Sequence, residues 1–156
     1  MPQRIRIGIM GTAKIARTVV PQMIASEHAD VVAVASRTLD KARQFADDFG
    51  IETAFGSYDA LFETQAVDAV YIPLPPSIHS EWTIQAAPAG KHVLCEKPLA
   101  INTSQAQEMI DAAIRNQIVL LDAVMWYHTA RAAAMRDIVL SGQLGVVRQV
   151  TSAFTF

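Results

Sequence analysis

The segment that most constrains the fold is residues 4–16, which read RIRIGIMGTAKIA. Its β-branched isoleucines favour a strand. Gly8 lies within this strand, Gly11 follows it, and a helical pattern begins at Lys14. A strand, a glycine turn and a helix start in this order are typical of the first turn of a dinucleotide-binding α/β fold. In that turn the free N–H groups of the helix hold a pyrophosphate, and small residues let it come close to the backbone.

The match to the dinucleotide fingerprint G-x-G-x-x-G is incomplete. From Gly11 the chain reads GTAKIA, so alanines replace the second and third glycines. The third position needs only a small residue for packing, whereas Ala13 at the second adds a methyl group where the phosphates approach. Two interpretations stay open: a buried strand and turn without a ligand, and a dinucleotide site. The candidate site comprises Gly8, Gly11, Thr12, Ala13, Lys14 and Ile15.

Strand and helix patterns alternate along the next hundred residues. Continuous apolar runs predict strands at residues 31–35, near Thr53, and at 69–72, 91–95 and 118–121. Helical spacing predicts helices at residues 14–26, 39–49, 59–63, 78–89 and 103–116, with Ser77 capping the fourth. Apolar strands that alternate with helices imply βαβ units and a Rossmann-type, doubly wound parallel sheet.

The last thirty residues have a different pattern. Thr129 can cap a helix over residues 130–140, and beyond Gly145 apolar and polar residues alternate strictly to Phe156. Alternation of period two predicts an antiparallel strand with one covered face, which carries Val150, Ser152, Phe154 and Phe156. We therefore predict a dinucleotide-binding domain over residues 1–125, and a crossover and the start of a second α/β domain over residues 126–156.

Composition narrows the partners and the location. The net charge of −2 and the absence of a basic run favour neither nucleic acid nor a membrane surface as a partner. The first apolar segment is too short for a signal peptide or a membrane span. Cys95 is the single cysteine and cannot form an internal disulfide, which suits a reducing cytoplasm and a core position. We expect a cytoplasmic protein without a metal site.

Ligands of parallel sheets bind at the carboxyl ends of the strands, where this chain carries two informative groups. Ser36 and Arg37 follow the second strand, where an NAD-binding domain usually has an acidic residue. A guanidinium at this position favours binding of the 2′-phosphate of NADP. The alternative is that Arg37 is a solvated surface residue. Glu96 and Lys97 end another strand. A lysine in the crevice can donate to a substrate oxygen and share in proton transfer, although a surface ion pair is the alternative.

Four segments together resemble the Gfo/Idh/MocA family of NAD(P)-dependent oxidoreductases, which includes glucose–fructose oxidoreductase, inositol dehydrogenase and dihydrodiol dehydrogenase-like members. They are residues 8–16, Ser36-Arg37, residues 75–79 and, most specifically, AGKHVLCEKPLA at residues 89–100. The resemblance continues through residues 125–128 and 141–156, so it covers the whole chain.

The resemblance implies a mechanism and a set of site residues. Lys97 would assist hydride transfer at a CH–OH or carbonyl group of a sugar, polyol or diol, with Glu96 and Pro98 shaping the nicotinamide site. Pro73, Leu74, Pro75 and His79 would lie near NADP, or near NAD as the second choice, although His79 could make only a local hydrogen bond. Trp126 and His128 are candidates for the substrate side, with packing as their alternative. Pro76, Leu74 and Pro88 depart from the common family pattern.

Members of the family also have a second domain that carries further substrate residues and often the oligomer interface. We therefore expect this chain to be the cofactor-binding half of an oxidoreductase that forms homo-oligomers, able to bind dinucleotide but not to catalyse. Two alternatives remain: a non-catalytic dinucleotide-binding or regulatory module, and a Rossmann-like scaffold without a ligand.

Overall fold

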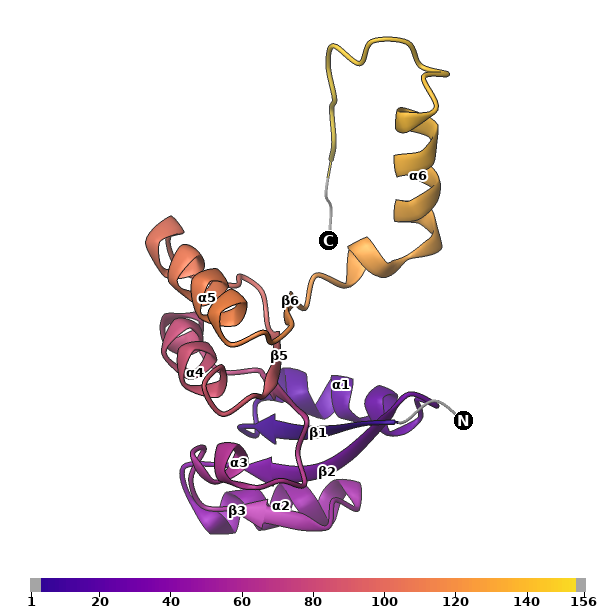
Figure 1. The fold of residues 1–156 in the computed structure, drawn as a ribbon. Helices are drawn as coiled ribbons and strands as arrows, with labels where there is room; N and C mark the ends of the chain where they lie inside the picture. The colour runs from indigo at the N-terminus through magenta and orange to yellow at the C-terminus, as the bar shows by residue number, and fades with distance from the viewer. Residues whose placement is uncertain (1–3, 154–156) are drawn as a thin grey trace. The chain divides into compact units, whose positions relative to one another are not determined.

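A computed structural model describes residues 4–153. A parallel sheet of six strands in the order β3-β2-β1-β4-β5-β6 forms its centre (Figure 1). The strands are β1 (Ile5–Met10), β2 (Ala29–Ala35), β3 (Thr53–Phe55), β4 (Ala69–Ile72), β5 (His92–Cys95) and β6 (Leu120–Asp122). The predicted Rossmann-type sheet is confirmed, and its order reverses beside β1, where ligands of this fold bind.

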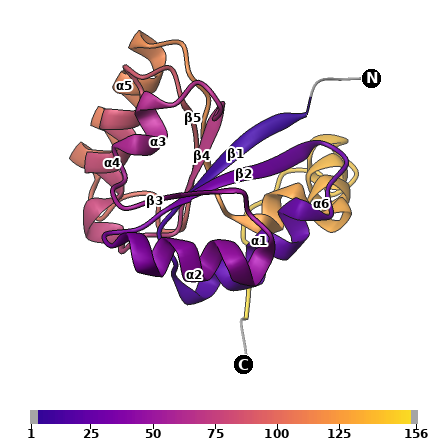
Figure 2. The same cartoon turned by 90° about the horizontal axis from the view of Figure 1, so that it is seen from below.

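Helices cover both faces of the sheet, as Figure 2 shows. They are α1 (Lys14–Ile24), α2 (Leu39–Phe49), α3 (Ala60–Glu63), α4 (His79–Ala86) and α5 (Thr103–Arg115). On one face, α1 and α2 bury Val20 and Phe45 against strand residues that include Tyr71. On the other, α3, α4 and α5 bury Leu61 and Met109. Burial on both faces explains why the strands read as continuous apolar runs.

Element bounds differ from the sequence prediction where turns are irregular. Helix α2 has the predicted bounds and ends at Gly50, whose φ of +68° is the left-handed conformation that glycine adopts without strain. The predicted helix at residues 78–89 is instead a 3₁₀ turn, η1 (Pro76–Ile78), followed by α4, which ends at Ala86. Ser77 lies inside η1 and does not cap α4, so that prediction was wrong.

The chain divides into two compact units between Ala123 and Val124. The second contains the 3₁₀ turn η2 (Met125–His128) and helix α6 (Ala130–Leu140), whose predicted cap Thr129 accepts a hydrogen bond from the Ala132 N–H at 3.1 Å. The predicted strand from residue 146 is not formed over residues 146–153, because no neighbouring strand in the described chain pairs with it. Phe154 and Phe156 lie outside the described residues.

No helix in residues 4–153 is both long enough and apolar enough to cross a lipid bilayer.

Candidate functional site

The turn between β1 and α1 has the geometry of an anion site. Gly11 has φ +103°, which is outside the range that side-chain-bearing residues adopt readily, and its N–H donates to the Ala35 carbonyl at 2.7 Å. Ala13 is the N-cap of α1 and provides no side-chain acceptor to the helix. The N–H groups of the first helical turn therefore remain available to an anion, and the helix dipole favours negative charge there.

The other residues predicted in this segment have different positions. A Cβ on Gly8 would lie 2.8 Å from Leu61 Cδ2, so this glycine permits close packing of β1 against α3 and does not line the site. Lys14 and Ile15 belong to the first turn of α1, with their side chains exposed. Their backbone N–H groups are the part that an anion could bind.

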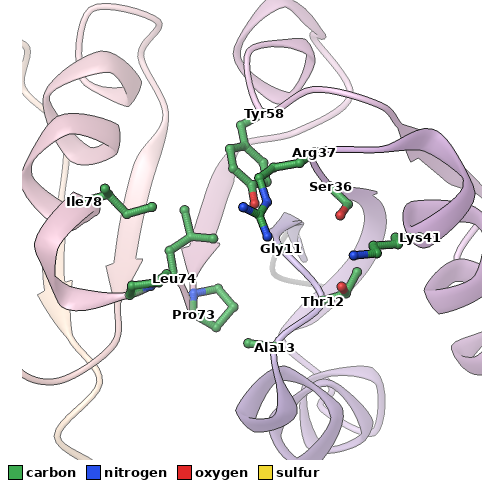
Figure 3. A pocket seen from close by; sticks show the side chains of 11 residues that line it. Gly11, Thr12, Ala13, Ser36, Arg37, Lys41, Tyr58, Pro73, Leu74 and Ile78 are labelled. Carbon is green, nitrogen blue, oxygen red and sulfur yellow. The ribbon is translucent and has the colours of Figure 1, made fainter.

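A cavity of about 310 Å³ opens at this turn (Figure 3). Four segments meet around it: the glycine turn, the carboxyl end of β2 with the start of α2, the loop between β3 and α3, and the loop after β4. Its walls are Gly11, Thr12, Ala13, Ser36, Arg37, Lys41, Tyr58, Pro73, Leu74, Pro75 and Ile78. The cavity thus brings together most of the predicted cofactor residues, and adds Lys41, Tyr58 and Ile78.

The wall after β2 is cationic. Ser36 is buried and its N–H donates to the Phe55 carbonyl at 3.1 Å, which fixes the backbone beside Arg37. Lys41 lies in the first turn of α2, four residues after Arg37, and both side chains line the cavity. Among residues 4–153 neither of them forms a salt bridge with a carboxylate. Two cations that form no salt bridge in the described residues make this wall attractive to a dianion such as a phosphate.

Tyr58 closes the same wall from the loop before α3. Its ring is almost buried and packs edge-on against Trp82, with 5.0 Å between the ring centroids. Burial raises the pKa of the Tyr58 hydroxyl, and the nearby Arg37 charge acts in the opposite direction. The hydroxyl is therefore protonated near neutral pH and can donate a hydrogen bond into the cavity. Sequence reasoning missed Tyr58 because it lies on a short irregular segment, three residues after the end of β3.

The proline-rich loop after β4, residues 73–75, forms the opposite wall. A Cβ on Gly11 would lie 2.8 Å from Leu74 Cδ2, so the glycine turn and the loop are in close contact (Figure 3). His79 follows this loop but does not line the cavity. It is fully buried, with Nε2 at 2.7 Å from the Leu74 carbonyl and Nδ1 at 3.0 Å from the Pro98 carbonyl. In this structure it can affect a ligand only through the loops that it joins.

Glu96 and Lys97 lie at the end of β5, at the same edge of the sheet as the cavity because β1, β4 and β5 are parallel. The Glu96 N–H donates to the Ile72 carbonyl at 3.1 Å, and its carboxylate accepts a 2.7 Å bond from the Tyr71 hydroxyl. The Lys97 ammonium has no hydrogen bond or salt bridge within residues 4–153. Neither Glu96 nor Lys97 lines the 310 Å³ cavity.

The remaining candidates lie elsewhere. Cys95 is buried, and burial raises the pKa of its thiol to about 12, so it is an inert core residue, as predicted. Trp126 and His128 are exposed residues of η2, in the second unit. No cluster of three or more histidine, cysteine or acidic side chains in the described part of the chain could hold a metal ion.

A parallel sheet with a positive-φ glycine turn, an uncapped helix N-terminus and a cationic second strand end defines a Rossmann-type nucleotide-binding domain. The chain belongs to the Gfo/Idh/MocA family: the model of its oxidoreductase domain with an NAD-binding Rossmann fold matches residues 5–123. The resemblance stated from the sequence is thereby confirmed.

Two of the relatives are named as a reductase and a dehydrogenase of sugars. A dTDP-3,4-didehydro-2,6-dideoxy-alpha-D-glucose 3-reductase from Streptomyces violaceoruber is 44% identical, over 97% of this chain and 44% of its own length. A D-xylose 1-dehydrogenase (NADP(+)) from Haloferax volcanii is 43% identical, over 96% of this chain and 46% of its own. The chain therefore spans slightly less than half the length of these relatives.

A solved structure shares the fold closely. It is a 3-ketoreductase from Actinomadura kijaniata in complex with TDP-benzene and NADP, in an open conformation. The two chains are 40% identical and superpose with a TM-score of 0.80, over 90% of this chain and 44% of the ketoreductase.

Proposed function

We propose that this chain is the NADP-binding part of an oxidoreductase that transfers hydride between a nicotinamide and a CH–OH or keto group of a sugar, polyol or diol. The observation that carries the cofactor assignment is the pair of cations, Arg37 and Lys41, which line the cavity after β2 and form no salt bridge with a carboxylate in residues 4–153. A 2′-phosphate supplies the dianion that such a wall binds. The relatives support the proposal, since they include a dehydrogenase named for NADP and a ketoreductase solved with it.

The residues of the cavity fit the phosphate groups of this cofactor. The N–H groups at the start of α1 would bind the pyrophosphate, with Gly11 allowing its approach to the backbone. Ser36, Arg37 and Lys41 would bind the 2′-phosphate, and Tyr58 would contribute its hydroxyl. Pro73, Leu74 and Ile78 offer an apolar wall opposite them. The bound cofactor supplies the hydride.

Lys97 is proposed as the residue that assists the reaction. Its ammonium is free of partners in the described residues and lies at the ligand-binding edge of the sheet. It would donate a hydrogen bond to the substrate oxygen, and would give that oxygen a proton in reduction or stabilise the alkoxide in oxidation. Glu96 and Pro98 would shape the site on either side of Lys97. On the substrate side we propose Trp126 and His128.

The greater length of the relatives supports a further domain in the whole protein. We propose a dinucleotide-binding domain over residues 1–125 and a second domain that starts at residue 126, contributes substrate residues and carries a homo-oligomer interface. A cytoplasmic location is proposed from the single, buried Cys95.

One observation favours a second candidate function, a dinucleotide-binding or regulatory module without turnover. The cavity contains the proposed phosphate ligands but neither Glu96 nor Lys97. The two candidates share NADPH binding and differ in turnover. NADPH titration of the chain is expected to show binding in both cases, whereas turnover of sugars and polyols by the full-length protein is expected only for the enzyme. Turnover that persists in Lys97→Met, or is absent from the wild type, would contradict the enzymatic proposal.

A further inference from the structure

The hydroxyl of Tyr71 is a buried polar group that the proposed function does not yet use. Tyr71 lies on β4, in the middle of the sheet, and its side chain is fully buried. Its register partner on β5 is Leu94, and paired residues of parallel strands point to the same face. Glu96 is two residues beyond Leu94 and continues on that face. This alternation brings the Glu96 carboxylate within hydrogen-bonding distance of the Tyr71 hydroxyl.

The Glu96 carboxylate has a partner for each oxygen. Oε1 accepts the Tyr71 hydroxyl bond at 2.7 Å, and Oε2 accepts the Lys97 backbone N–H at 3.2 Å. One bond comes from the rigid core of the sheet and the other from the loop that carries Lys97. A half-exposed carboxylate without the first bond would be free to rotate toward water. The Tyr71 hydroxyl therefore selects the orientation in which Glu96 also holds the Lys97 backbone.

We propose that Tyr71 is a positioning residue: its hydroxyl fixes the Glu96 carboxylate, and through it the start of the loop that presents Lys97. This inference rests on the proposed role of Lys97 in hydride transfer. Tyr71 itself does not line the cavity and reaches the reaction only through Glu96.

The first test does not depend on activity. It records ¹H–¹⁵N NMR spectra of this chain as wild type, Tyr71→Phe, Glu96→Gln and the double variant. Tyr71→Phe removes one oxygen and keeps the ring, so the core should stay packed. The Lys97 amide resonance is expected to move in each variant, and the double variant should resemble Glu96→Gln alone. The Ala123 amide, which donates to the Cys95 carbonyl at 2.8 Å, serves as the internal reference. Tyr127→Phe, which removes an exposed hydroxyl in the second unit, is the matched control.

The second test measures steady-state kinetics of the same variants in the full-length protein. Tyr71→Phe is expected to lower kcat on the order of tenfold, the scale of one charge-assisted hydrogen bond, with KM for NADPH unchanged within about twofold. It should lower kcat no further in a Glu96→Gln background. An unmoved Lys97 amide, an unchanged kcat, or effects that multiply in the double variant would overturn the proposal. If the wild type has no turnover, the proposed function fails, and the NMR arm still decides whether Tyr71 orients Glu96.

Discussion

Replacing Arg37 by alanine should weaken binding of NADPH and leave binding of NADH almost unchanged. The guanidinium lines the cavity beside Lys41 and forms no salt bridge with a carboxylate in residues 4–153. A hydrogen bond to a charged group contributes about 1.5–3 kcal/mol, which corresponds to a 10- to 150-fold change in Kd. Arg37 is exposed, so solvent screening places the expected loss in the lower half of this range.

The assay is a fluorescence or calorimetric titration of the chain with each cofactor at fixed ionic strength. Arg43→Ala is the matched control, because Arg43 is an exposed cation of α2 that does not line the cavity. Lys41→Ala should reproduce the Arg37→Ala effect in weaker form, and the double variant should bring the NADPH affinity close to that for NADH. Equal losses of both cofactors in Arg37→Ala, or an equal loss of NADPH affinity in Arg43→Ala, would refute the assignment of this wall to the 2′-phosphate.

Three further predictions address the reaction, the turn and stability. Lys97→Met in the full-length protein should lower kcat about 10²- to 10⁴-fold with little change in cofactor affinity, as measured by steady-state kinetics; near wild-type turnover would make Lys97 structural. Gly11→Ala should destabilise the chain by about 1–2 kcal/mol in urea unfolding, because alanine is strained at a φ of +103°. Gly90→Ala is the control: it also places alanine at a positive φ, but away from the cavity, and should spare NADPH binding. Hydrogen bonding to Arg6 lowers the pKa of Asp68 from 3.8 to about 2, so its contribution to stability is present above pH 4 and is lost as the pH falls toward 2. Thermal unfolding of Asp68→Asn should lack that part of the acid dependence; an acid limb identical to wild type would contradict the assignment.

The sheet and the phosphate turn were predictable because they depend on local patterns. Apolar runs of strand length between helical segments imply a parallel sheet with both faces covered, and the observed β2 and β4 have that environment. Ser36 and Arg37 follow a strand directly, so their place at the ligand-binding edge was fixed once the sheet was recognised.

The residues that sequence reasoning missed depend on tertiary structure. Lys41 reaches the cavity because α2 begins directly after the Ser36-Arg37 segment and its first turn faces the same space. Tyr58 arrives from an irregular loop, and no periodic signal predicts its direction. His79 was expected near the cofactor. Its two ring nitrogens face the Leu74 and Pro98 carbonyls, and the side chain does not line the cavity.

The alternation after Gly145 led to the strand prediction that failed. Residues 146–153 have the residue pattern of a strand with one covered face, but a strand also requires a partner for its backbone hydrogen bonds. None is present in the described part of the chain. The periodicity of a sequence shows which side chains of a segment can share one face. Whether that segment forms a strand depends on a neighbouring strand that can pair with its backbone.

The central claim, that the cavity beside Gly11 and Arg37 binds NADP, is tested most directly by NMR mapping of the two oxidised cofactors on this chain. NADP⁺ is predicted to shift the amide resonances of Gly11, Thr12 and Ala13 together with those of Ser36 and Arg37. NAD⁺ should need a higher concentration, and its shifts at Ser36 and Arg37 should be smaller. Absence of binding, or shifts that are the same for both cofactors at Ser36 and Arg37, would contradict the claim.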